Sequence, residues 1–241
     1  RLAERFKVPK ALVGALLVGF GTSAPELAAS LTAVFQQEVG GVELAVGNIV
    51  GSNVANLGLV LAIPVLIWDN VIPPHGTREQ AGYSFIGSLF FAAVVYFNLN
   101  SALGGIGLFA IFLITNFLIL RFFKKSGVFP QSPPRQHTWP LSRELIVMII
   151  GLVLTVSSPR WIVSSAVSIG NEFGWEGGFI GFSLIAIGTS LPELVTSIVA
   201  ALKGKTDLAI GNVIGSNLLN QLLILGSCGV VSGLEQLRID P

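Results

Sequence analysis

Seven apolar stretches, each long enough to cross a lipid bilayer, dominate this sequence of 241 residues and restrict the folds open to it. A spanning helix needs about 20 mostly apolar residues, and only helices and closed barrels satisfy every backbone hydrogen bond inside a bilayer. The period-two alternation of barrel strands is absent from the sequence, so we expect an all-α, polytopic membrane protein. The stretches lie at residues 11–35, 44–68, 81–98, 102–123, 144–169, 177–202 and 208–233.

The composition excludes several classes of protein. Charged residues make up 11% of the chain, against roughly 25% in a soluble domain. The net charge of +1 offers no basic excess for nucleic acid. The single cysteine, Cys228, rules out an internal disulfide, and its apolar surroundings favour a structural role. We therefore expect membrane lipid around the protein, no cofactor and no obligate protein partner.

The positive charges indicate an orientation. If all seven stretches cross the bilayer, all but two of the 14 lysines and arginines fall on one side, the exceptions being Arg160 and Arg238. Cytoplasmic loops collect lysine and arginine. We therefore place residues 1–10 and 124–143 in the cytoplasm, and expect a multi-pass protein of the plasma or inner membrane.

Two pairs of segments repeat within the chain. GTSAPEL at 21–27 matches GTSLPEL at 188–194 in six of seven positions. AVGNIVGSN at 45–53 matches AIGNVIGSN at 209–217 in six of nine positions, and the differences are exchanges of Val and Ile. The two copies are therefore homologous units.

The repeated units run in opposite directions through the membrane. The spans that begin them are five apart, an odd number, and inverted repeats with broken helices are typical of secondary transporters. Extending the repeat predicts five plus five helices, of which this chain holds about seven. We expect a first half at 1–123 without its first helix, a short loop at 124–143, and a second half at 144–241 without its last two helices.

Two acids, Glu26 and Glu193, lie deep within spans at equivalent positions of the repeat. Burying a charge at the bilayer centre costs about 3 kcal/mol on insertion scales, so such acids indicate function. Arg160 is the sole cation available to pair with them, but it lies off the midplane and cannot neutralise two sites. A mobile cation or a proton is the remaining counter-charge.

Each acid follows a proline that interrupts its helix. Pro25 and Pro192 lack an N–H and clash with the carbonyl four residues earlier. We therefore expect the helices to open and expose carbonyls around residues 19–22 and 186–189.

Hydroxyl and amide side chains surround the acids in both repeats. In each repeat a Thr lies four residues and a Ser three residues before the Glu, so all three share a helix face. A Ser and an Asn one turn apart follow on the next helix. These candidate ligands are Thr22, Ser23, Ser52 and Asn56 in the first repeat, and Thr189, Ser190, Ser216 and Asn220 in the second. Four more asparagines fit interhelical hydrogen bonding equally well, namely Asn48, Asn53, Asn212 and Asn217. The glycine pairs Gly47 with Gly51 and Gly211 with Gly215 predict close helix approach.

The ligand chemistry favours Ca²⁺ and Na⁺. These side chains and carbonyls can supply the six to eight hard oxygens that Ca²⁺ takes. No thiolate or imidazole converges on the site, since His75 and His137 fall in loops, which argues against zinc and copper. Two negative charges balance one Ca²⁺ or monovalent cations, so competition for one set of oxygens provides a basis for exchange.

These motifs identify a family resemblance. GTSAPE at 21–26 with GNIVGSN at 47–53, and GTSLPE at 188–193 with GNVIGSN at 211–217, resemble the two alpha-repeats of the cation/Ca²⁺ antiporter superfamily. The resemblance is strongest to its bacterial and archaeal sodium/calcium exchangers. It implies an inverted repeat of ten helices, Na⁺ influx that drives Ca²⁺ extrusion, and alternating access at a central diamond of ion sites.

The resemblance also implies roles for individual residues. The Ca²⁺ ligands would be the carboxylates of Glu26 and Glu193 and the carbonyls of Thr22 and Thr189. The Na⁺ ligands would be Ser23, Ser190, Ser52 and Ser216, and Asn56 would lie at the middle site. Asn220 stands where family members often carry Asp, which removes a titratable group. The loop at 124–143 is too short for the Ca²⁺-sensing domains of animal exchangers, so we expect no such regulation.

Three other functions remain as alternatives to Na⁺/Ca²⁺ antiport. A H⁺/Ca²⁺ exchanger of the same fold is one, since a buried Glu can carry a proton, although the hydroxyl beside each acid favours Na⁺. A cation channel is another, although broken inverted helices favour alternating access. The third is an intramembrane enzyme, which we do not expect because the spans hold no Asp dyad, HExxH or Ser/His arrangement.

Overall fold

The structure is a computed structural model that describes residues 19–36, 41–67, 77–97, 102–126 and 140–236. Every regular element within these ranges is helical, and each of the seven predicted spans contains helix. This confirms the expected all-α fold. The segments used to assign the cytoplasmic side, 1–10 and most of 124–143, and both histidines lie outside the described residues.

The first repeat consists of two interrupted helices. The first is split at Ser23, and the second contains a π-helical segment that begins at Asn56. π-Helical turns inside α-helices are rare and occur often at functional sites. The elements are α3 (Gly19–Thr22), α4 (Ala24–Gln36), α5 (Gly41–Ala55), η2 (Asn56–Leu61) and α6 (Ala62–Ile67).

The second repeat has the same interruptions. The first of its helices is split at Ser190, and the second turns π-helical next to Asn220. The elements are α11 (Gly177–Ile180), η3 (Gly181–Ile185), α12 (Ala186–Thr189), α13 (Leu191–Leu202), α14 (Thr206–Leu218), η4 (Leu219–Ile224) and α15 (Leu225–Gln236). The sequence repeat is therefore a structural repeat.

Four further helices connect and flank the two repeats. They are α7 (Thr77–Tyr96), α8 (Ala102–Ser126), α9 (Leu141–Ser157) and α10 (Pro159–Glu172). Pro159 starts α10 at the first helical position, where its missing N–H is harmless. It therefore divides the fifth predicted span into two nearly continuous helices.

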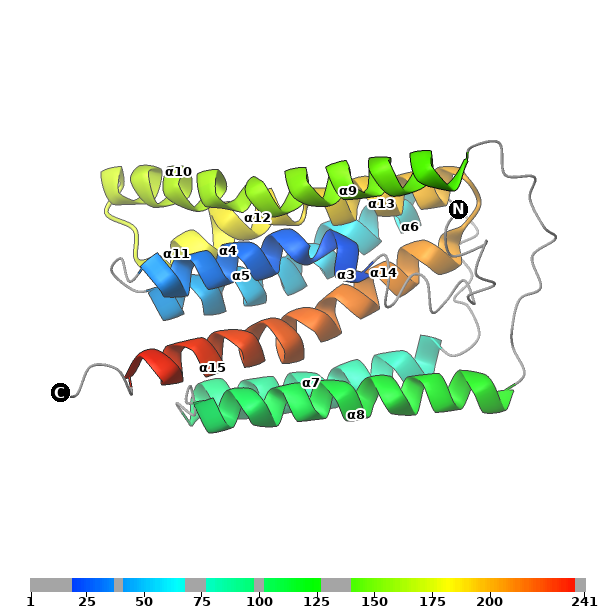
Figure 1. Cartoon of the computed structure of the whole chain (residues 1–241), viewed down its shortest axis with the longest axis horizontal. Helices are drawn as coiled ribbons and strands as arrows, with labels where there is room; N and C mark the ends of the chain where they lie inside the picture. The colour runs from blue at the N-terminus through cyan, green and yellow to red at the C-terminus, as the bar shows by residue number, and fades with distance from the viewer. Residues whose placement is uncertain (1–18, 37–40, 68–76, 98–101, 127–139, 237–241) are drawn as a thin grey trace.

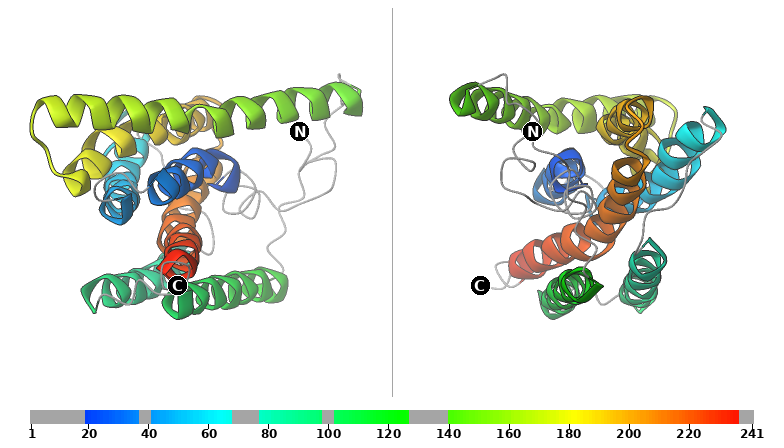
Figure 2. Two further views of the ribbon diagram at one scale, coloured as in Figure 1. Left: turned by 60° about the vertical axis from the view of Figure 1, so that its left-hand side comes forward. Right: turned by 90° about the vertical axis from the view of Figure 1, so that its right-hand side faces the viewer.

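The flanking helices lie on opposite sides of the repeats. Figures 1 and 2 show the α7–α8 hairpin on one side, α9 and α10 on the other, and the broken helices between them. The hairpin packs against α14 and α15, and α9 and α10 pack against α4. The broken helices are therefore shielded on two sides.

Glycines let the two repeats touch backbone to backbone. A Cβ atom at Gly47 would meet the carbonyl oxygen of Gly178, and one at Gly51 would meet that of Phe182. Gly181 approaches the carbonyl of Leu44 in the same way. The predicted close approach at Gly47 and Gly51 is thus confirmed, and it joins α5 to η3.

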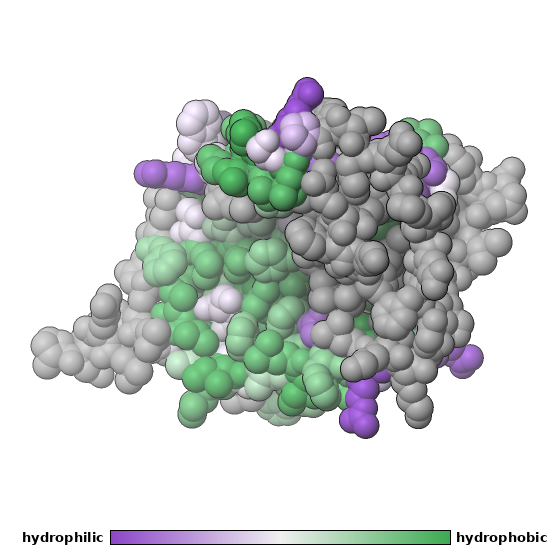
Figure 3. Space-filling view, turned by 45° about the vertical axis from the view of Figure 1, so that its right-hand side comes forward, coloured by the Kyte–Doolittle hydropathy of each residue, from purple (hydrophilic) through white to green (hydrophobic). Residues whose placement is uncertain are grey.

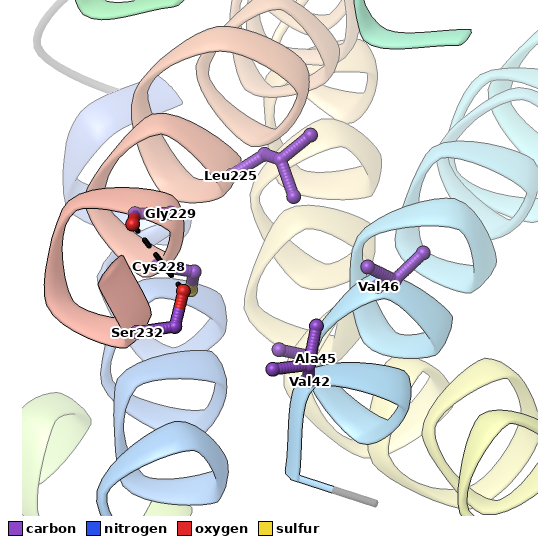
Figure 4. Close-up of a pocket in the computed structure, with 7 residues that line it drawn as sticks. All are labelled: Val42, Ala45, Val46, Leu225, Cys228, Gly229 and Ser232. Carbon is purple, nitrogen blue, oxygen red and sulfur yellow. Dashed lines mark hydrogen bonds between the residues drawn. The ribbon is translucent and has the colours of Figure 1, made fainter. Parts of the chain in front are cut away.

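Small and aliphatic residues join α5 to α15 (Figure 4). Val42, Ala45 and Val46 face Leu225 and Cys228 across a cavity of about 10 Å³. The Cys228 thiol is free and buried in this contact. This agrees with the structural role expected of it.

Apolar side chains cover much of the outer surface. Figure 3 shows a broad hydrophobic patch, with hydrophilic residues towards the upper and lower edges of that view. Among the described residues, four helices are long and apolar enough to cross a membrane, at Gly41–Leu66, Ala102–Ile119, Gly177–Leu202 and Leu208–Gly233. On α9, five consecutive large apolar side chains from Ile146 to Ile150 are exposed. The surface is that of a multi-pass integral membrane protein.

Gly51→Ala should destabilise the contact between α5 and η3. The new Cβ would meet the carbonyl of Phe182 and lie 2.6 Å from the Ala186 Cβ. Overpacking of this kind costs about 1–3 kcal/mol, so thermal unfolding in detergent should begin at a lower temperature. Gly82→Ala on α7 is the matched control, since its Cβ would have no neighbour within 4 Å. Equal unfolding temperatures for both variants would contradict this packing.

Candidate cation-binding site

Glu26 and Glu193 are both 0% exposed. Each lies in the first turn of the half-helix that follows a break, Glu26 in α4 and Glu193 in α13. A helix N-terminus favours negative charge there. The fold therefore positions two carboxylates at equivalent places within its interior.

The helix breaks adjoin the stretches whose carbonyls the sequence predicted to be exposed. They lie at Ser23 and Ser190, just beyond the expected stretches 19–22 and 186–189. The helices do not unwind there, because Ser23 N–H still donates to Gly19 O at 2.8 Å and Ser190 N–H to Ala186 O at 3.0 Å. The interruption at each serine therefore leaves these backbone bonds intact.

Each carboxylate accepts a hydrogen bond from a serine of the other repeat. Ser23 Oγ donates to Glu193 Oε1 at 3.2 Å, and Ser190 Oγ donates to Glu26 Oε1 at 3.3 Å. Each carboxylate therefore depends on the other repeat for one of its hydrogen bonds.

A second pair of contacts crosses the repeats through Asn48 and Asn212. Thr189 Oγ1 donates to Asn48 Oδ1 at 3.2 Å, and Asn48 Nδ2 donates to Ser30 Oγ at 3.0 Å. In the equivalent chain, Thr22 Oγ1 donates to Asn212 Oδ1 at 3.1 Å, and Asn212 Nδ2 donates to Ser197 Oγ at 3.3 Å. Asn48 Nδ2 also lies 3.3 Å from Glu26 O. Both threonine hydroxyls thus serve the framework around the acids.

A third pair joins the asparagines of the two π-helical regions. Asn56 Nδ2 donates to Asn217 Oδ1 at 2.9 Å, and Asn220 Nδ2 donates to Asn53 Oδ1 at 3.2 Å. The segments η2 and η4 also pack against α13 and α4, which carry the two acids. Asn56 and Asn220 therefore lie on segments that pack against the helices of the two acids.

Six buried oxygens of the site have no hydrogen-bond partner among the described residues. They form three equivalent pairs, one atom from each repeat, and all belong to side chains with 0% exposure. They are Oε2 of Glu26 and Glu193, Oγ of Ser52 and Ser216, and Oδ1 of Asn56 and Asn220. Buried acceptors without partners cost free energy. A hard cation can bind such a set of oxygens. Ca²⁺, for example, takes six to eight oxygen ligands.

All ten predicted ligands lie on the four interrupted helices that build this site. Nine are buried, and Thr22 is half-buried. Within the described part of the chain no cluster of three His, Cys, Asp or Glu side chains occurs. The candidate ligands are two acids and neutral oxygens. Arg160 is exposed on α10, which agrees with its exclusion as the counter-charge.

Ser30 and Ser197 also belong to this network, although they were not among the predicted residues. Both lie one helical turn after an acid, at matched positions of the repeat, and this match was the signal available. A third buried acid, Glu144 in the first turn of α9, was not predicted either. A carboxylate there interacts favourably with the N-terminal end of the helix dipole.

Comparison with known proteins decides the family. The family described as sodium/calcium exchanger protein matches residues 1–122 and 143–240. The chain belongs to the sodium/calcium exchanger family. Both repeats and all ten candidate ligands fall within the matched ranges.

Relatives and solved structures extend over nearly all of the chain. A putative antiporter, CaxA of Alkalimonas amylolytica, is 34% identical over 93% of this chain and 71% of its own length. The inner membrane protein YrbG of Escherichia coli is 31% identical, over 100% and 74%. The solved sodium/calcium exchanger of Methanococcus jannaschii is 28% identical, with a TM-score of 0.65 over 97% of this chain and 73% of that one. The protein is therefore a membrane exchanger in its family and fold, not an enzyme.

Asn48→Ala should destabilise the protein. It would leave the Thr189 and Ser30 hydroxyls without this partner in the interior, at about 1–3 kcal/mol for a buried unsatisfied group. Asn212→Ala, which breaks the equivalent chain, should lower the unfolding temperature by a similar amount. Asn116→Ala is the control, since its amide donates to Phe112 O of its own helix rather than across the repeats. A larger loss in the control would refute the structural role of the crossed chains.

Proposed function

We propose that the protein exchanges Ca²⁺ for Na⁺ across the membrane by alternating access at a site built on Glu26 and Glu193. The observation that carries the proposal is the set of six buried oxygens without partners, arranged in equivalent pairs. Two of them belong to carboxylates, so a bound cation compensates both the charge and the missing contacts. Membership of a sodium/calcium exchanger family supports the same cargo.

Charge balance accounts for obligatory exchange. The two carboxylates together match one Ca²⁺, or monovalent cations bound in its place. An empty site leaves two charges buried at low dielectric, where an uncompensated ion costs several kcal/mol. Reorientation of the empty protein is therefore slow, and each ion must be replaced by the other before the site changes sides.

The neutral ligands favour Na⁺ over H⁺ as the coupling ion. A proton needs only a carboxylate, whereas Na⁺ uses the hydroxyl and amide oxygens that surround the acids. The Methanococcus jannaschii exchanger has been solved after soaking with Na⁺ and Sr²⁺. That similarity supports a role for Na⁺ in this protein. Ser52, Ser216, Asn56 and Asn220 are the ligands that a proton would leave unused.

The proposed transport mechanism uses the inverted halves at 1–123 and 144–241. We assign Ca²⁺ to the two Glu carboxylates and the carbonyls of Thr22 and Thr189. Na⁺ is assigned to the serines of the site, with Asn56 and Asn220 between the acids. The crossed bonds of Ser23 and Ser190 support an exchange in which both halves take part.

Ca²⁺ flux in proteoliposomes of the full-length protein tests the coupling ion. An outward Na⁺ gradient should drive Ca²⁺ uptake, and a pH gradient of equal size without Na⁺ should not. Flux that follows the pH gradient alone would identify a H⁺/Ca²⁺ exchanger instead. Downhill Ca²⁺ flux that needs no counter-ion at all would identify a channel.

Glu26→Gln and Glu193→Gln test the site. Each removes one of the two charges that balance Ca²⁺, so Ca²⁺ affinity should fall by more than tenfold, which corresponds to about 1.4 kcal/mol. Binding is measured by isothermal titration calorimetry and transport by Na⁺-driven Ca²⁺ flux. Glu172→Gln, an exposed acid at the end of α10, is the matched control and should behave as wild type. Unchanged affinity in either Glu variant of the site would rule out this assignment.

A further inference from the structure

Two asparagines outside the predicted ligand set contact the two ligand amides. Asn217 accepts the hydrogen bond of Asn56 at 2.9 Å, and Asn53 accepts that of Asn220 at 3.2 Å. In both bonds the ligand donates through Nδ2, and its own Oδ1 has no partner among the described residues. The same atoms have the same roles in each repeat.

The orientation of an amide decides whether it can bind a cation. Asn carries a carbonyl oxygen on one branch and an NH₂ group on the other. The terminal torsion is broad and roughly two-fold, so rotation exchanges the two branches at little intrinsic cost. An NH₂ group turned toward a cation repels it, so an unrestrained amide is a poor ligand.

We infer that Asn53 and Asn217 are positioning residues that turn the Asn220 and Asn56 carbonyl oxygens toward the cation. The inference rests on the proposed function of the site. By accepting from Nδ2, each positioning residue fixes the NH₂ branch against the opposite helix. The remaining branch, Oδ1, is the buried atom without a partner that the site needs.

The positions of the four asparagines support two distinct roles. Asn56 and Asn220 are fully buried, on η2 and η4, which pack against the helices of the acids. Asn53 and Asn217 instead line a cavity of about 410 Å³ between α5, α7 and α14, and Asn53 is half-buried. The positioning residues therefore lie behind the ligands, and their contribution passes through the amides they hold.

A double-mutant cycle separates positioning from general helix packing. Ca²⁺ affinity is measured by calorimetry on the full-length protein in detergent. Asn217→Leu, which keeps the branched shape but loses the acceptor, should weaken Ca²⁺ binding about 10–100-fold, as is typical when the partner of a metal ligand is lost. The double variant that carries both Asn56→Leu and Asn217→Leu should bind Ca²⁺ as strongly as Asn56→Leu alone, within about twofold, because Asn217 acts only through Asn56.

The crossed pairing gives an internal control. Asn217 and Asn220 are neighbours on one helical run but do not share a hydrogen bond, so the losses of Asn217→Leu and Asn220→Leu should multiply. Asn53 should couple to Asn220 in the same way as Asn217 couples to Asn56. Asn116→Leu on α8 should keep wild-type affinity. Losses that multiply in all pairs would overturn the inference and indicate a packing role.

A conservative variant keeps the inference testable if the leucine variants do not fold. Asn217→Asp retains an oxygen that accepts from Asn56 Nδ2, so Ca²⁺ affinity should be kept or increased. A folded Asn217→Asp protein with a loss of tenfold or more would overturn the inference. If wild type itself binds no Ca²⁺, the proposed function fails and this inference fails with it. If wild type binds and Glu26→Gln does not, the cycle tests the positioning role alone.

Discussion

Exclusion of water from two carboxylates is the constraint on which the rest of this structure depends. Glu26 and Glu193 reach 0% exposure because helices meet at glycines and because α7 to α10 cover the broken helices. In such an interior every polar atom must find a partner. The hydrogen bonds around the acids satisfy most of these atoms and leave a symmetric set of oxygens for a cation.

The polar framework makes the two repeats depend on each other. Serine hydroxyls, asparagine amides and threonine hydroxyls all form bonds with groups of the opposite repeat. One repeat alone would expose its acceptors to hydrocarbon without partners, at several kcal/mol each. The paired construction therefore follows from hydrogen-bond satisfaction as much as from symmetry.

The sequence predicted the helical class and the repeated motifs, because hydropathy and repetition are local signals. It also nominated ten candidate ligands, nine of which are buried. It further predicted exposed carbonyls around 19–22 and 186–189, whereas Gly19 O and Ala186 O still accept backbone hydrogen bonds from Ser23 and Ser190. Proline predicts a lost hydrogen bond, but the backbone that surrounds it decides where the chain bends. The roles of Asn53 and Asn217 also lay beyond the sequence, since only the fold shows which atom of an amide meets which partner.

The half-buried amide of Asn53 has a consequence for how such a protein diverges. Asn220 donates a hydrogen bond to it, but an aspartate at position 220 would have none to donate. Asn53 could then rotate and offer its own NH₂ group to the new carboxylate. One residue thus supports either a neutral or an anionic neighbour, so the charge of the transport site can change during evolution by a single substitution.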